Sequence, residues 1–383
     1  MDTLPRGRSS RRTLWIAVMA FAALGMPKAA FGVAWPSVSV ELGVPVGALG
    51  LVIAVFVGCY LLSTGTSGAV AAAIGIGRLL TVACWSAAAG LAGYALAPTM
   101  GVLLAAAIVL GFASGYVDAG INTHVALRHG ARAMGALHAG FGIGATLGPL
   151  VMTGLLTAEH SWRWGMWMLF AFQAAVAVRF LPSEEVWTSS SPPPGRRRQA
   201  LPAAAGWALG LFALYAAVEI GVGQWTFTLL TEGRGMSDTV GGLAVTGLYA
   251  GLTGARLLLG VVGHRSTPQR LSTTGTVVAL AGVMALWLAP TGSVAIVATV
   301  VTGFALGPIF PLQTLLTPQR VGAAGTASVV GYQIAAASLG AIAIPGAIGV
   351  LVDRFDVGII APALAATAGL LVLADAALRR ASR

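Results

Sequence analysis

The sequence predicts an all-α integral membrane protein with twelve transmembrane helices in two pseudo-symmetric six-helix halves. Three observations support this fold class. Of the 383 residues, 57% are hydrophobic and only 9% are charged, against roughly 25% charged residues in an ordinary soluble domain. Long apolar runs recur along the chain, and short matches relate its first half to its second. A soluble protein of this size could not cover its surface with so few charges.

The apolar runs are long enough to cross a bilayer as helices, which takes about 20 residues each. Unbroken apolar runs differ from the alternating pattern of barrel strands, so helices are the expected form. We place the spans at 14–36, 47–71, 79–98, 101–126, 134–157, 163–182, 203–230, 239–261, 271–290, 293–316, 324–351 and 357–378.

The basic residues indicate the orientation of these spans. With both termini on the cytoplasmic side, 18 of the 22 basic residues fall on that side, three fall outside, and Lys28 lies within the first span. An excess of Lys and Arg marks cytoplasmic loops. We therefore expect a multi-pass protein of the plasma membrane, the inner membrane of a bacterial cell, with both termini cytoplasmic. Flanking arginines also explain the net charge of +10, so we expect no nucleic-acid partner.

One polar stretch separates the first six spans from the last six. It contains three consecutive serines (189–191), three prolines (192–194) and three arginines (196–198). Such a composition builds no core and predicts a flexible linker. The predicted organisation is an N-terminal half at 1–182, a cytoplasmic linker at 183–202 and a C-terminal half at 203–383.

The two halves match at a constant offset of 192 residues. The run Gly111-Phe112-Ala113-Ser114-Gly115 of the fourth span corresponds to Gly303-Phe304-Ala305-Leu306-Gly307 of the tenth. The same offset relates Gly68 to Gly260, Arg78 to Arg270 and Gly148 to Gly340. Several matches at one offset indicate a duplicated six-helix unit, which is an established transporter architecture.

These features resemble the major facilitator superfamily over essentially the whole chain. The family's signature loop between spans 2 and 3 begins here at Gly68 and ends at Arg78, but Ala72 and Ala73 stand at its Asp-Arg positions. In the equivalent loop after span 8 these positions hold His264 and Arg265, so the charged gate is weak in both halves. The residues that we assign to gating are Gly68, Arg78, Arg256, Gly260 and Arg265.

Within the superfamily the chain resembles the fucose-permease-like branch. The resemblance rests on residues 115–122, 138–144, 219–225 and 307–311, and it implies uptake of a sugar-like solute. A competing pattern in the fifth span, Gly135, Gly144, Gly148 and Pro149, is similar to the family's antiporter motif. That pattern implies export of drug-like or biosynthetic compounds, but small residues also serve close helix packing.

Four ionisable residues lie inside the predicted spans: Lys28, Asp118, Glu219 and Arg256. A charge at the bilayer centre costs on the order of 3 kcal/mol, so each should face a cavity or a partner. The resemblance implies that spans 1, 4, 7 and 10 line a central cavity, and three of the four charges lie on these spans. Asp118 and Glu219 are our candidates for proton coupling.

Helical spacing places further polar and aromatic side chains beside these charges. Residues three and four apart share a helix face, as Lys28, Phe31 and Trp35 do in the first span. The same spacing relates Asp118 to Asn122 in the fourth span and Tyr215 to Glu219 in the seventh. We leave two roles for Lys28 open: a switchable pair with Glu219 or Asp118, or attraction of an anionic group of the substrate. The candidate substrate-binding residues are Lys28, Phe31, Trp35, Asn122, Tyr215, Gln224, Trp225 and Gln313.

The absence of other motifs narrows the function. The sequence has no phosphate-binding Gly-x4-Gly-Lys-Ser/Thr motif, metal-ligand cluster or nucleophile arrangement, so we expect neither an enzyme nor a metal or cofactor. We expect a monomeric secondary transporter in membrane lipid, coupling protons to uptake of a small polar, sugar-like solute by symport. Proton-antiport export is the first alternative. A non-transporting receptor or scaffold is the second, against which the short loops argue.

Overall fold

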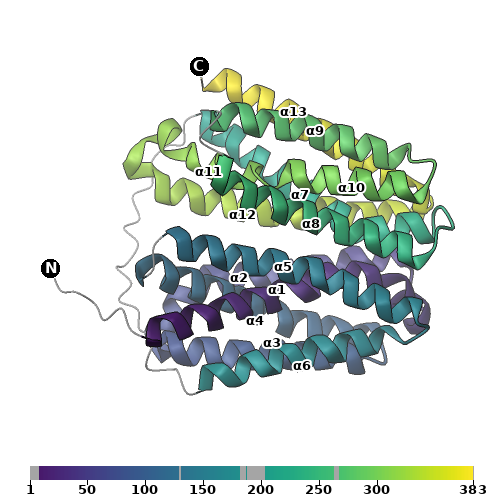
Figure 1. Ribbon diagram of the computed structural model, residues 1–383, viewed down its shortest axis with the longest axis horizontal. Helices are drawn as coiled ribbons and strands as arrows, with labels where there is room; N and C mark the ends of the chain where they lie inside the picture. The colour runs from purple at the N-terminus through teal and green to yellow at the C-terminus, as the bar shows by residue number, and fades with distance from the viewer. Residues whose placement is uncertain (1–7, 129–130, 182–186, 188–202, 263–266, 383) are drawn as a thin grey trace.

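The computed structural model describes residues 8–128, 131–181, 187, 203–262 and 267–382, and these parts form helices joined by short connections (Figure 1). The elements in chain order are α1 (Arg8–Leu42), η1 (Val46–Ala48), α2 (Leu49–Ile74), α3 (Ile76–Leu96), α4 (Met100–Arg128), α5 (Ala131–Thr157), α6 (Trp162–Phe180), α7 (Ala203–Thr231), α8 (Asp238–Val262), α9 (Pro268–Trp287), α10 (Gly292–Leu306), α11 (Ile309–Leu315), α12 (Thr317–Arg354), η4 (Val357–Ile359) and α13 (Ile360–Ala381).

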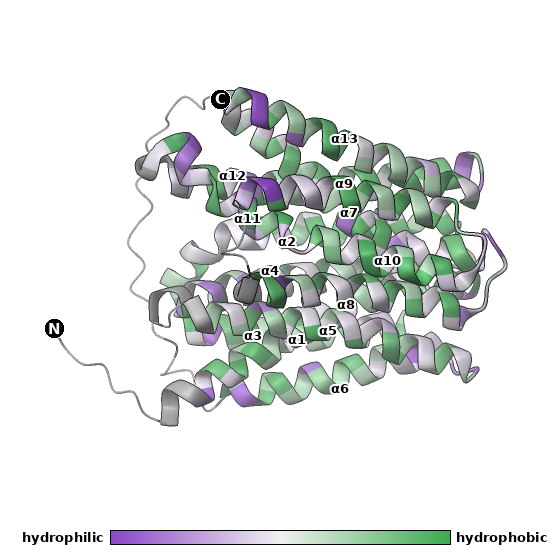
Figure 2. Cartoon of the chain, turned by 45° about the horizontal axis from the view of Figure 1, so that its top comes forward, coloured by the Kyte–Doolittle hydropathy of each residue, from purple (hydrophilic) through white to green (hydrophobic). Residues whose placement is uncertain are grey.

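The predicted fold class is confirmed, and each predicted span coincides with a helix or, for 293–316, with the pair α10 and α11. Within the described residues, eleven helices are long and apolar enough to cross a membrane. The remaining long helix, α6, has 19 residues and carries an arginine at each end. In Figure 2 the polar residues gather mainly toward the two ends of the bundle and apolar residues fill its middle, as a bilayer requires.

Prolines and glycines shape three helices differently from the prediction. The tenth span is broken after Leu306 because Pro308, which precedes α11, has no N–H to continue the backbone ladder. The α1 helix runs through both Pro27 and Pro36 to Leu42, six residues beyond the predicted end. The α12 element is kinked at Gly322, whose φ of 72° is a left-handed conformation that favours glycine. A short helical piece from Thr317 therefore precedes the long piece, which begins near the predicted start of 324.

The helices form two layers, α1–α6 and α7–α13, which lie one above the other in Figure 1. The predicted linker and the limits of the two halves stay predictions, because 182–186 and 188–202 lie outside the described residues. Trp187 is described, and its indole stacks on Phe180 with ring centroids 5.3 Å apart. This contact places one linker residue against the end of α6.

The repeat is visible in how glycines pack equivalent helix pairs. A Cβ at Gly111 of α4 would lie 2.5 Å from the Phe56 carbonyl oxygen of α2, and one at Gly303 of α10 would lie 1.8 Å from that of Leu248 in α8. The contacted residues are themselves 192 positions apart. Gly115 and Gly307 repeat the pattern on Tyr60 and Leu252. The same small-residue contact therefore joins α4 to α2 and α10 to α8.

We expect Gly303→Ala to destabilise the protein because the added methyl group would press on the Leu248 backbone. Overpacking of this kind costs about 1–3 kcal/mol. The matched control is Gly254→Ala in α8, where a Cβ has no neighbour within 4 Å. Thermal unfolding of the purified proteins should show a lower melting temperature for Gly303→Ala alone. Equal melting temperatures for both variants would contradict the role of this contact.

The bundle has two ends, which we call terminal and distal. The terminal end holds the start of α1 and the end of α13, at the left of Figure 1, and the distal end lies opposite. At the distal end the halves are in contact: the Gly47 N–H donates to the Asp353 carboxylate at 2.8 Å, and Gly50 of α2 lies against the backbone of Gly346 in α12. Thr157 of α5 and Thr239 of α8 also meet there, with hydroxyl oxygens 3.4 Å apart.

At the terminal end α2 has no such partner. Four of the five buried residues of α2 lie in its distal half, the exception being Ser63. Near the terminal end the exposed residues are Gly65, Thr66, Gly68, Ala69, Ala72, Ala73 and Ile74. These positions cover most of the helix circumference. A Cβ at Gly65 or Gly68 of α2, or at Gly331 of α12, would meet no atom within 4 Å. The two helices that meet at the distal end are therefore apart at the terminal end.

Candidate substrate and proton site

The first polar cluster of the site lies wholly within the N-terminal half. Asp118, in the middle third of α4, accepts hydrogen bonds from the Tyr60 phenol of α2 and from the Asn122 amide at 3.0 Å. Asn122 lies one turn further along α4, which agrees with the predicted shared face. The close approach of α2 and α4 at Gly115 brings the phenol to the carboxyl group. Both oxygens of Asp118 thus have neutral donors.

The second cluster lies wholly within the C-terminal half. Glu219, in the middle of α7, accepts a hydrogen bond from Tyr215 one turn earlier. Its carboxylate also forms an ion pair with Arg256 of α8, with an N–O distance of 3.9 Å. Arg256 further donates to the Tyr215 hydroxyl at 3.1 Å and to the Gly307 carbonyl at 3.2 Å. The guanidinium therefore joins α7, α8 and the break between α10 and α11.

Lys28 lies between these clusters on α1, directly after Pro27. Its ammonium group lies 5.4 Å from the centroid of the Phe141 ring of α5, a distance suited to a cation–π interaction. Among the described residues no carboxylate oxygen lies within 4.0 Å of it. Lys28 is near enough to Asp118 for its charge to act on that carboxyl group. In the structure Glu219 therefore pairs with Arg256, and Lys28 is in direct contact with neither Asp118 nor Glu219.

Gln224 of α7 connects the two halves at this level. Its amide donates to the Lys28 carbonyl at 2.6 Å, and a Cβ on Gly32 would lie 2.8 Å from the Gln224 Cα. The backbones of α1 and α7 therefore touch one turn beyond Lys28 toward the distal end. This contact therefore lies on the distal side of the charged groups, as do the other contacts between the two halves at the distal end.

Four other predicted substrate residues are packed away from these clusters. Phe31 is 6% exposed and stacks on Tyr94 at 4.9 Å. Trp35 is fully buried and donates to the Val46 carbonyl. Trp225 is also fully buried and donates to the Pro345 carbonyl at 3.2 Å. Gln313 is enclosed between Ser272 and Arg320, toward the terminal end. In this conformation all four contribute to packing.

Three of the five predicted gating residues lie at the terminal end. Gly68 is exposed in the last turns of α2, Arg78 is exposed in the first turn of α3, and Gly260 lies near the end of α8. Arg265 lies outside the described residues. Arg256 differs from these because it lies deeper and holds Glu219.

Two residues of the site escaped the sequence analysis. Tyr60 supplies a hydrogen bond to Asp118, and Phe141 supplies the ring beneath Lys28. A lone phenol in the apolar second span was the available signal for Tyr60. His138, one turn before Phe141, is exposed on α5 and lies within electrostatic range of Arg256 across the halves. Among the described residues no three His, Cys, Asp or Glu side chains gather to hold a metal ion.

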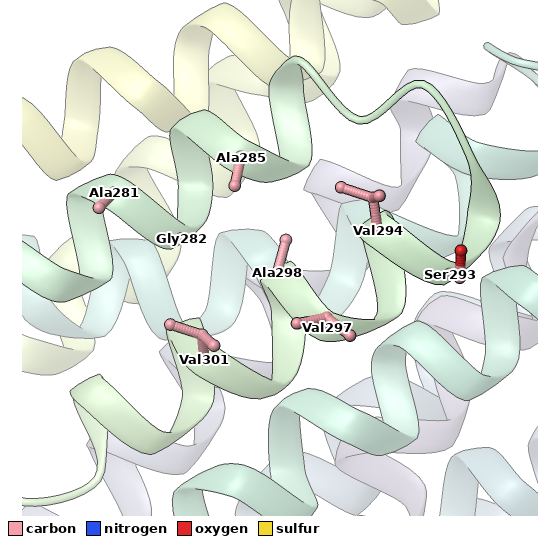
Figure 3. Close-up of a pocket in the computed structure, with 8 residues that line it drawn as sticks. All are labelled: Ala281, Gly282, Ala285, Ser293, Val294, Val297, Ala298 and Val301. Atoms are coloured by element: carbon pink, nitrogen blue, oxygen red, sulfur yellow. The ribbon is translucent and has the colours of Figure 1, made fainter.

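A separate apolar pocket lies between α9 and α10 (Figure 3). Small residues, including Gly282, Ala285 and Ala298, leave a volume of about 400 Å³. Ser293 is its single polar side chain among the eight lining residues. Such a lining suits a hydrocarbon chain and offers a polar solute almost nothing to bind.

The sequence matches the family model of the major facilitator superfamily over residues 15–345. The chain belongs to the major facilitator superfamily. This membership confirms the broad resemblance and identifies the protein as a membrane transporter rather than an enzyme. It leaves the fucose-permease-like branch without support, and no curated protein matches the chain.

Solved transporter structures share the fold. The nucleoside transporter NupG is 14% identical with a TM-score of 0.77, and the similarity covers 96% of this chain and 99% of that one. A bacterial homolog of the human lysosomal transporter Spinster, in an inward-facing and occupied conformation, is 16% identical with a TM-score of 0.73, covering 100% and 98%. The human organic anion transporter MFSD10 (TETRAN) is 14% identical with a TM-score of 0.67, covering 98% and 100%.

Proposed function

We propose that this protein is a secondary active transporter that moves a small polar solute by alternating access, with protons as the coupling ion. The observation that carries the proposal is the arrangement of the charges. Asp118 is held within the N-terminal half and Glu219 within the C-terminal half, and Lys28 of α1 lies between the two clusters beside the contact of α1 with α7. Ionisable residues at membrane depth mark substrate and proton pathways.

The packing of the halves supports a rocking motion. The hydrogen bonds of Asp118 and those of Glu219 stay within their own halves, so relative rotation leaves both clusters intact. The contacts that must break are Gln224 on Lys28, Gly47 on Asp353 and Thr157 on Thr239. We assign the terminal end to the cytoplasm because Arg12, Arg78, Arg179, Arg270, Arg320, Arg379 and Arg380 lie there. The conformation is then open to the inside, in a plasma-membrane monomer with both termini cytoplasmic.

Uptake remains our preferred direction over export. The glycines behind the export alternative have a packing role, because a Cβ at Gly144 or Gly148 would lie 2.0 or 2.2 Å from carbonyl oxygens of α1. The solute classes of the structural neighbours, nucleosides and organic anions, support a small polar solute. Because the fucose-permease-like branch lacks support, no observation favours a sugar over the other small polar solutes.

A transport assay tests the proposal directly. Solutes are first chosen by thermal stabilisation of the purified protein with a panel of sugars, nucleosides, amino acids and monocarboxylates. Proteoliposomes are then given a pH gradient, and we expect the stabilising solute to accumulate on the alkaline side, as symport requires. Accumulation on the acidic side would show antiport export instead. Binding without movement in any gradient would favour a receptor.

We expect the double variant Thr157→Cys and Thr239→Cys to lose transport when oxidised and to regain it on reduction. The two hydroxyl oxygens are 3.4 Å apart and exposed at the distal end, so cysteines there can approach disulfide geometry. A disulfide would hold the distal end shut and block alternating access. The controls are the two variants that carry only one of these substitutions, Thr157→Cys or Thr239→Cys, and that also retain the native Cys59 and Cys84. Full transport by the oxidised, crosslinked protein would contradict the rocking mechanism.

A further inference from the structure

We propose that the solute is a monoanion, such as a monocarboxylate, that binds the Lys28 ammonium together with a proton on Asp118. This inference rests on the proposed function and names the substrate class of the same site. It goes beyond that function because it specifies the charge of the solute, the residue that binds it and the way in which proton and solute are linked.

Lys28 is the one charge of the four whose side chain has no ion-pair or hydrogen-bond partner among the described residues. Glu219 is held by Tyr215 and Arg256, and Asp118 by Tyr60 and Asn122. An ammonium group at this depth is costly unless a partner or water compensates it. The Phe141 ring occupies one side of the group, and an ammonium has three N–H donors. Donors therefore remain for an anionic ligand.

The charge balance of the site also favours an anionic solute. Glu219 and Arg256 neutralise each other within the C-terminal half. In the N-terminal half, the Asp118 charge acts on Lys28 at longer range. A proton on Asp118 removes that negative charge and leaves Lys28 uncompensated. An anion then restores neutrality, so that proton and anion bind cooperatively and cross together without net charge.

The surroundings of Asp118 contain few other groups able to produce this linkage. The α2 helix contributes the Tyr60 phenol, α1 contributes Lys28, and α4 itself contributes Asn122. The α3 helix presents the apolar Ile76 and Leu80 to neighbouring Gly120. On α5, His138 is an ionisable side chain within electrostatic range of Arg256, while His124 of α4 packs on Trp187. His138 is therefore the group to control for.

Binding to the purified protein tests the inference without any transport step. The probes are benzoate, phenylacetate and lactate, each compared with its uncharged amide, at about pH 5.5 and about pH 7.5, where all three acids stay largely ionised. We expect at least one carboxylate to bind tighter than its amide, and tighter at the lower pH. Lys28→Met should weaken that binding about 30-fold or more. Asp118→Asn should make it equally tight at both pH values, and His138→Asn should preserve the wild-type pH dependence.

Each outcome decides the inference. Wild-type protein that binds no carboxylate better than its amide would overturn it, and this comparison needs no variant that has to fold. If the affinity for the carboxylate still depends on pH in Asp118→Asn but not in His138→Asn, the assignment of the proton to Asp118 is overturned. Lys28-dependent binding with no solute movement in proteoliposomes would count against the proposed function alone. Accumulation of a neutral solute by Lys28→Met protein would count against this inference alone.

Discussion

Replacing Arg256 by methionine is expected to destabilise the protein strongly, by about 3 kcal/mol or more. The guanidinium binds the Glu219 carboxylate, the Tyr215 hydroxyl and the Gly307 carbonyl. Its removal strands a carboxylate in the membrane interior, where an isolated charge is costly. Expression yield and the melting temperature of the purified protein measure the effect.

A second substitution identifies the partner. Adding Glu219→Gln to Arg256→Met removes the stranded charge and should recover most of the lost stability, giving a coupling energy between neighbouring sites. The matched control adds Glu219→Gln to Lys28→Met, where we expect no recovery because Lys28 does not contact Glu219. The arrangement of this site would be contradicted if Glu219→Gln restored stability to Lys28→Met, while its effect on stability were merely additive with that of Arg256→Met.

The fold was largely predictable because bilayer thickness fixes the length of an apolar run. Runs of about 20 residues gave the spans, and the constant offset of 192 gave the duplicated halves, now visible in the contacts of Gly111 and Gly303. What hydropathy could not give is how a helix ends or breaks. Both Pro36 and Pro308 lie in apolar runs, yet α1 continues through the first and α10 ends before the second.

The site was predictable along each helix but not between helices. Spacing of four residues correctly placed Asn122 beside Asp118 and Tyr215 beside Glu219. It carries no information on the rotation of one helix against another. The contacts of Tyr60 with Asp118 and of Arg256 with Glu219 therefore appear only in the structure. A shared face also does not imply a shared environment, since Trp35 follows Lys28 on α1 but is enclosed at the distal contact.

Asp118→Asn is expected to abolish accumulation of the solute under a pH gradient while solute exchange across the membrane continues. An amide cannot take up and release a proton, so the gradient no longer does work on the solute. It keeps a similar shape and, as a neutral group, resembles the protonated acid, so the solute still binds. Proteoliposomes loaded with unlabelled solute measure exchange, and empty ones with an imposed gradient measure accumulation.

The matched variant is Glu219→Gln, for which we expect accumulation to continue. Protonation of Glu219 would break its ion pair with Arg256, whereas Asp118 has only neutral hydrogen-bond donors and can gain a proton without separating two charges in contact. Asp118 is therefore the better proton carrier of the two. Accumulation that survives Asp118→Asn and disappears in Glu219→Gln would reverse the roles of the two acids. Accumulation in both variants would remove protons on these carboxylates from the mechanism.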